Sequence, residues 1–162
     1  MGPGVGFTGP RTRLSLCINA NWSFRFVGER DQRYAHPPAD GTGWRPIALP
    51  HTWSTYEFSG ALHPFIRDAG ESDNLAWWRG WGWYRKEIRI SSAYRGRRIF
   101  LEFDGVQKYC RVYANGVAVA EHKGGFTSFS VDITDYVDFD ADTLVAVEVS
   151  NKQTDEFGGI PP

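Results

Sequence analysis

Apolar and polar residues alternate along most of this chain with a period of two. The alternation begins in residues 14–18 (LSLCI) and 22–27 (WSFRFV) and returns in 44–50 (WRPIALP). Six further runs follow: WYRKEIRI (83–90), RRIFLEF (97–103), KYCRVYA (108–114), VAVAEH (117–122), TSFSVDI (127–133) and TLVAVEV (143–149). This period is typical of half-buried strands. The pattern therefore predicts an all-β chain without a sustained helix.

Turn residues separate these runs and indicate how they pair. Asn115-Gly116 links 108–114 to 117–122, and because both positions of a tight hairpin turn need positive φ, the pair predicts antiparallel neighbours. Thr134 is expected to cap a single helical turn before the last strand. Evenly spaced strands favour an antiparallel β-sandwich of jelly-roll type. We expect its inner layer to include Ile99, Leu101, Phe103, Val112, Val145, Val147 and Val149.

The rest of the chain contains two loops and a leader. Residues 28–43 are polar and carry a Pro-Pro pair, which predicts a loop. Residues 54–82 show no clear periodicity, and long loops in compact domains are often functional. We expect the Gly/Pro-rich residues 1–13 to be a flexible arm or a cloning remnant. Residues 14–162 then form one domain, which we expect to lack a strand at its C-terminal end.

Charge and cysteine content exclude several classes of partner. The 162 residues carry a formal net charge of −1 and a pI of about 6.4, so no positive field attracts nucleic acid or anionic lipid. No apolar run is long enough to cross a bilayer. Cys17 and Cys110 lie far apart without a CxxC pair, which favours core packing and leaves a disulfide open. The compartment is not indicated.

Metal binding has little support in the sequence. Five aspartates near the C-terminus offer hard oxygen ligands, but their spacing does not match an EF-hand, and turn chemistry explains them better. They are Asp132, Asp135, Asp138, Asp140 and Asp142. The histidines are scattered without metal spacing, and His51, between Pro50 and Thr52, is expected to pack within its loop. We predict no metal and no cofactor.

Four motifs follow one another along the chain: WRPIALPHTW (44–53), RGWGWYRKEI (79–88), LEFDGVQKYCRVYANGVAVAEHKGGFTSFSVDIT (101–134) and LVAVEVSN (144–151). In this order they resemble the N-terminal sugar-binding domain of glycoside hydrolase family 2, the family of β-galactosidases, β-glucuronidases and β-mannosidases. The resemblance implies a galactose-binding-domain-like jelly roll and a parent that is a retaining β-glycosidase. It places the catalytic glutamates in a separate (β/α)8 barrel of ~250 residues, which this chain cannot contain.

The acidic residues do not suggest the facing carboxyl pair that glycoside hydrolysis needs. Glu87 alternates with Arg85 and Arg89, and Glu102 shares a face with Arg98. We therefore expect both glutamates to belong to rows of solvated charged side chains on the outside of a sheet. We predict no catalytic residue and no hydrolytic activity for this chain alone.

An aromatic run near the end of the long loop is the strongest candidate for ligand contact, because flat rings stack on the C–H faces of sugars while polar neighbours bind the hydroxyls. The candidate carbohydrate-binding residues are Asn74, Trp77, Trp78, Arg79 and Trp81. Packing explains the three tryptophans of this group equally well. For Trp83 and Tyr84, at a strand start, we expect packing within the domain.

The sequence leaves three functions open. The first is a carbohydrate-binding accessory domain that contacts a β-glycoside and the catalytic barrel of its parent. The second is a scaffold that packs against the barrel or joins subunits and never touches sugar. The third, a free-standing carbohydrate-binding module, is disfavoured by the family motifs. An open sheet edge or exposed tryptophans would also favour a homo-oligomer. The sequence does not indicate which sugar is bound.

Overall fold

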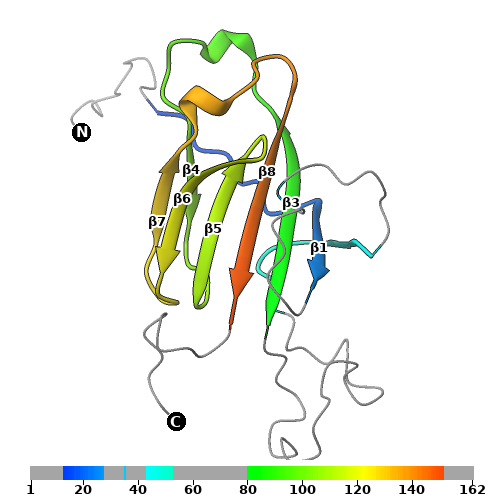
Figure 1. Cartoon of the computed structure of the whole chain (residues 1–162). Helices are drawn as coiled ribbons and strands as arrows, with labels where there is room; N and C mark the ends of the chain where they lie inside the picture. Colours follow the sequence, from blue (N-terminus) through cyan, green and yellow to red (C-terminus); the bar gives the residue numbers. More distant parts are fainter. Residues whose placement is uncertain (1–12, 28–34, 36–42, 53–79, 152–162) are drawn as a thin grey trace, which may run out of the picture.

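The computed structural model describes residues 13–27, 35, 43–52 and 80–151, and the strands in this part of the chain form two antiparallel sheets (Figure 1). The larger sheet contains, in spatial order, β2 (Arg45–Ile47), β1 (Trp22–Phe26), β3 (Trp81–Arg89), β8 (Asp142–Ser150), β5 (Tyr109–Ala114) and β6 (Val117–Lys123). The smaller sheet pairs β4 (Phe100–Phe103) with β7 (Phe129–Asp132). The predicted all-β sandwich is confirmed.

The last strand lies at the centre of the larger sheet. β8 pairs with β3 on one side and β5 on the other, and residues 143–150 are all buried. A strand covered on both faces reads as a nearly continuous apolar run, as TLVAVEV does. The sheet is therefore built around the C-terminal strand of the described chain.

The core lies between the two sheets, on the inner face of the larger one. Leu101 and Val131 from the smaller sheet pack there against side chains of β1, β5 and β8. Of the predicted inner layer, the fully or nearly buried members are Leu101, Val112, Val145, Val147 and Val149. Ile99 and Phe103 are partly buried and pack against this cluster. The predicted inner layer is confirmed.

The predicted hairpin joins β5 to β6. Asn115 and Gly116 both have positive φ, +48° and +82°. The Asn115 side chain also accepts a hydrogen bond from the backbone N–H of Leu144 (2.9 Å) and donates one to Asp138 (2.8 Å). One turn residue therefore fixes the hairpin and ties it to the start of β8.

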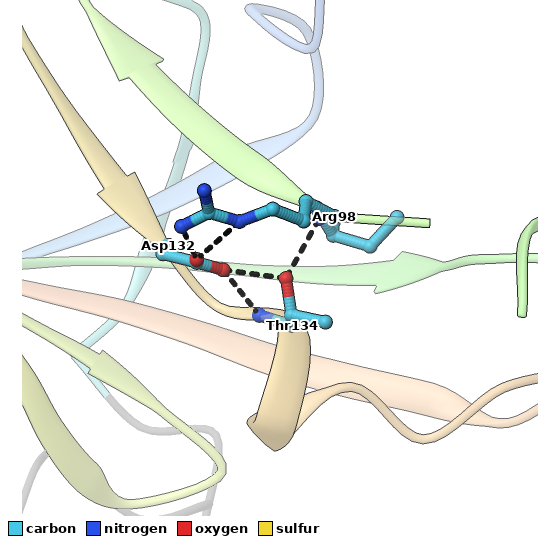
Figure 2. A network of polar contacts seen from close by, with 4 residues as sticks. Arg98, Asp132 and Thr134 are labelled. Atoms are coloured by element: carbon cyan, nitrogen blue, oxygen red, sulfur yellow. Dashed lines mark hydrogen bonds and ion pairs between the residues drawn. The ribbon is translucent and has the colours of Figure 1, made fainter. Parts of the chain in front are cut away.

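The predicted helical turn exists, but its cap is a different residue. Thr134 is the first residue of η5 (Thr134–Tyr136), and its backbone N–H donates to Asp132 at 3.0 Å. The Thr134 hydroxyl instead accepts the backbone N–H of Ile99 at 2.9 Å, and Arg98 donates to Asp132 (Figure 2). Our assignment of Thr134 as the cap was wrong, because the aspartate two residues earlier satisfies the free N–H.

The predicted strand at 14–18 is also wrong. The residues from Arg13 to Asn19 form no strand, and Leu14 and Leu16 are 51% and 70% exposed. Their alternation lacks a hydrogen-bonded neighbour strand, and only Ile18 packs against the core. No helix among the described residues is long and apolar enough to cross a bilayer.

Candidate functional site

Of the predicted carbohydrate-binding residues, only Trp81 belongs to the described part of the chain, and Asn74, Trp77, Trp78 and Arg79 lie outside it. Trp81 is the first residue of β3, not part of the loop as we expected. It is 7% exposed, and its ring meets Tyr109 edge-on at 5.7 Å. This burial agrees with the packing alternative, and sugar contact by the group stays a prediction.

Aromatic pairs continue across the outer face, defined as the face of the larger sheet that points away from β4 and β7. Trp83 is 0% exposed and packs against Tyr113 with ring centres 5.3 Å apart. Together with Ala35 and Ala146 they form a second buried cluster, separate from the core between the sheets. The expected packing of Trp83 is confirmed. Both faces of the larger sheet are therefore packed around their centre.

A charged row crosses the same outer face. Glu148 is 0% exposed and lies across from Trp83 on β3 and Arg111 on β5. Arg111 donates to Glu121 on β6 at 2.8 Å, and this hydrogen bond lowers the pKa of Glu121. Our sequence analysis missed Glu148. One feature of the sequence could have indicated it: Glu148 is the only acidic residue in the apolar run TLVAVEV, and this run forms the central strand of the sheet.

Arg85 departs from the charge ladder that we predicted for β3. Glu87 and Arg89 are exposed as expected, but Arg85 is partly buried, and its guanidinium carbon lies 4.0 Å from the ring centre of Trp44. Burial lowers the pKa of this guanidinium. Glu102 also pairs differently, with Arg13, while Arg98 pairs with Asp132. The prediction of a solvated row of charges on β3 is therefore wrong at Arg85.

His51 is a packing residue as predicted, but it packs against the inner side of the sheet and not within its loop. Its ring lies 4.7 Å from Phe24, and its Nδ1 is 2.9 Å from the hydroxyl of Tyr84. Burial raises the pKa of this phenol. The contact anchors the residues that precede 53–79 to β3. It is a structural contact, because both partners are held within the packed layer.

The remaining polar candidates have local structural partners. Asp138 accepts from Asn115, and Asp140 accepts the backbone N–H of Ser92 at 2.9 Å. Within residues 13–27, 35, 43–52 and 80–151, no three His, Cys, Asp or Glu side chains are grouped so that they could hold a metal ion. Cys17 and Cys110 are free thiols. Cys110 is buried as expected, and burial raises its pKa to about 12, whereas Cys17 is exposed, so the expected core packing is wrong for Cys17.

The outer face thus combines flat rings with charged groups that donate and accept hydrogen bonds. Ligands with apolar C–H faces and polar edges match this chemistry. Its flank, around Trp44 and Arg85, is only partly buried, whereas the centre, at Trp83 and Glu148, is closed. A ligand would therefore meet the sheet at its flank.

Sequence comparison relates the chain to large carbohydrate-active enzymes. The model of a family described as the sugar binding domain of the family 2 glycosyl hydrolases matches residues 17–157. The chain is 30% identical over 145 residues to a β-glucuronidase of Formosa agariphila and 33% identical over 144 residues to a β-galactosidase of Bacteroides ovatus. These alignments cover 90% and 89% of this chain but only 14% and 16% of the relatives.

Solved structures agree with this relation. A family 2 glycosyl hydrolase of Bacteroides cellulosilyticus superposes with a TM-score of 0.69 at 34% identity, covering 84% of this chain and 17% of that one. A Bacteroides uniformis β-glucuronidase, covalently bound to cyclophellitol-6-carboxylate aziridine, gives a TM-score of 0.69 at 30% identity, with coverages of 90% and 15%. The similarity therefore spans most of this chain and a small part of each enzyme.

Proposed function

Because this chain belongs to the family 2 glycosyl hydrolase sugar-binding domains, we propose that it binds carbohydrate as an accessory domain of a β-glycosidase. The observation that carries the proposal is the family match over residues 17–157. The partly buried flank of the outer face, with the ring of Trp44 beside Arg85, supports it, since sugar recognition uses stacking together with hydrogen bonds to hydroxyls.

The parent reaction is proposed from the relatives, which are a β-glucuronidase and a β-galactosidase. Retaining hydrolysis uses two carboxyl groups ~5 to 5.5 Å apart across the scissile bond. Glu148 is enclosed within the sheet at 0% exposure, so it is a poor candidate for either carboxyl group. We assign the hydrolytic step to another part of the parent and sugar binding to this domain.

The scaffold function remains a second candidate, and a specific observation favours it. Phe126, in the turn between β6 and β7, is 89% exposed. Large apolar side chains exposed to this degree often mark protein contacts when they belong to a wider patch. On this alternative, the domain packs against the catalytic barrel or a second subunit and contacts no sugar.

Calorimetric titration of the chain with β-glycosides tests the two functions. We expect dissociation constants of ~1 mM, since one stacked ring and few hydrogen bonds must offset the cost of immobilising the ligand. Trp77→Ala or Trp78→Ala should weaken binding at least ~tenfold if these rings form the platform, whereas the matched control Phe126→Ala should bind as wild type. Absence of binding to any glycoside would leave only the scaffold function.

A further inference from the structure

The side chain of Asn115 is exposed to solvent, yet both ends of its amide group are hydrogen-bonded. Its Oδ1 atom accepts from the backbone N–H of Leu144 at 2.9 Å. Its Nδ2 atom donates to the backbone oxygen of Tyr136 at 3.0 Å and to the carboxylate of Asp138 at 2.8 Å. The amide therefore joins the β5–β6 turn to η5 and to the start of β8, at one end of the molecule (Figure 1).

The residue that follows Asn115 makes this amide chemically vulnerable. Of all the asparagines in the sequence, only Asn115 precedes a glycine. Because Gly116 has no Cβ, its backbone nitrogen can approach the preceding side chain with little steric hindrance. When this nitrogen attacks Cγ of Asn115, the N–Cγ bond forms, the Cγ–Nδ2 bond breaks, and the proton of the attacking nitrogen leaves with Nδ2 in ammonia. Water then opens the resulting cyclic imide to aspartate or isoaspartate.

The folded structure opposes the first step of this reaction. The amide of Asn115 must leave its partners on η5 and β8 before its Cγ atom can turn to the nitrogen of Gly116. One of these partners, Asp138, is a charged acceptor, and hydrogen bonds to charged groups are the stronger ones. A group held in this way reacts in proportion to the fraction of molecules in which the contact is open. Deamidation should therefore be slow while this end of the sandwich is closed.

The product of the reaction cannot restore the contacts of the amide. A carboxylate has no N–H group, so the hydrogen bonds to the Tyr136 oxygen and to the Asp138 carboxylate are lost. A negative charge also replaces the Nδ2 group that lies 2.8 Å from Asp138, and like charges at this distance disfavour each other. The modified turn is therefore held less firmly to the start of β8.

From these contacts we infer that Asn115 is a deamidation site gated by the fold. Its amide persists while the β5–β6 turn is bonded to η5 and β8, and it is lost when this end of the molecule opens. The loss is irreversible, because ammonia leaves, and it weakens the closed state to which the turn would return. Asn115 is therefore a modification site whose reactants are the chain itself and water, and the inference does not depend on carbohydrate binding.

Mass spectrometry of the peptide that contains Asn115 measures the reaction rate during incubation of the 162-residue chain at mildly alkaline pH. We expect the folded chain to react at least ~a hundredfold more slowly than the chain in guanidinium chloride. Asp138→Ala should speed the folded reaction at least ~tenfold, because it removes the charged acceptor. The matched control Asp135→Ala, at an exposed residue of η5, should react as wild type. In guanidinium chloride the three proteins should react alike. Equal rates for the folded and unfolded wild type, or for folded Asp138→Ala and wild type, overturn the inference.

Thermal melting of Asn115→Asp, which reproduces a product of the reaction, tests the second half of the inference and decides it should Asp138→Ala fail to fold. The melting temperature should fall by at least ~4 °C, since two hydrogen bonds are lost and two carboxylates face each other. The matched control is Asn21→Asp, the same change at another exposed asparagine with positive φ, and it should shift melting by less than ~2 °C. Equal melting of these two variants overturns the inference.

Discussion

The two faces of the larger sheet are both packed, yet with opposite chemistry. The inner face, against β4 and β7, contains valines such as Val112, Val145 and Val147, each at most 3% exposed. The outer face has Trp83 and Glu148, both 0% exposed, and the partly buried Arg85. Burial alone therefore does not distinguish a core from a site.

The difference lies in what each face demands of its side chains. Aliphatic groups need only complementary volume, so the inner face is satisfied once the two sheets close on each other. Buried charges and indoles need oriented partners as well. The outer face therefore fixes the orientation of its side chains more closely than the inner face does, and a binding surface requires side chains with fixed orientations.

The largest effect should come from removing the central ring of the outer face. Trp83→Ala should lower the free energy of unfolding by about 3–5 kcal/mol, since it deletes a fully buried indole packed on Tyr113. Trp83→Phe keeps a ring and should cost less. Urea unfolding measures both variants. A loss below ~1 kcal/mol for the alanine variant would show that the outer cluster contributes nothing as a second core.

On the inner side, Leu101→Ala should cost about 2–5 kcal/mol. Leu101 is 6% exposed and belongs to β4, so the truncation opens a cavity where the smaller sheet meets the larger one. The matched control is Phe126→Ala at an 89% exposed position, expected to change stability by less than ~0.5 kcal/mol. Equal losses for the two variants would contradict the two-layer core.

The inner face was predictable from the sequence and the outer face was not, for a physical reason. Alternation identifies apolar residues on one side of a strand, and Asn115-Gly116 fixed a pairing because its turn chemistry is local. The burial of Arg85 depends on Trp44, which comes just before β2, two strands away from β3 in the sheet and far along the chain. The unpaired run at 14–18 failed likewise, because strand formation needs a partner that alternation does not reveal.

For the candidate site, the sequence indicated an aromatic run whose contact with sugar stays a prediction. Within that run, Trp81 lies at the start of β3, where its ring packs on Tyr109. Glu148 sits in a run that otherwise reads as core, and only the register that brings Trp83 and Arg111 beside it reveals a polar row. Which charged side chains are buried depends on their cross-strand neighbours, and the sequence alone does not reveal those neighbours.

A smaller, pH-dependent effect is expected at the edge of the inner layer, in the network of Figure 2. Hydrogen bonds from Thr134 and Arg98 lower the pKa of Asp132 from 3.8 to about 2. A carboxylate whose pKa is lower in the folded state stabilises the protein above its unfolded pKa, and that contribution disappears as the pH falls through the folded value. The wild type should therefore melt above Asp132→Asn at neutral pH, and the gap should close between pH ~4 and ~2.

The control for this pH dependence is Asp135→Asn, which makes the same charge change at an exposed residue of η5. Thermal melts of the three proteins from neutral to acid pH measure the gap. A gap between wild type and Asp132→Asn that stays constant down to pH ~2 would show that the ionised carboxylate is not what the network stabilises.

The smallest effect should appear at the rim of the outer face, where the Arg111 and Glu121 side chains are 25% and 40% exposed. Glu121→Gln should lower the free energy of unfolding by about 0.2–1 kcal/mol, because exposed ion pairs are screened by water. In this variant Arg111 still has Glu148 as its cross-strand neighbour on β8, so an acidic side chain remains beside it.

The difference in free energy of unfolding between wild type and Glu121→Gln should shrink further in ~1 M salt, where the screening length falls to ~3 Å. The loss in Leu101→Ala should persist at the same salt concentration. Urea unfolding at low and high salt makes the comparison. A cost above ~2 kcal/mol, or one that salt leaves unchanged, would mean that the charged row is sealed from solvent as far as β6 and that the outer face has no open rim on that side.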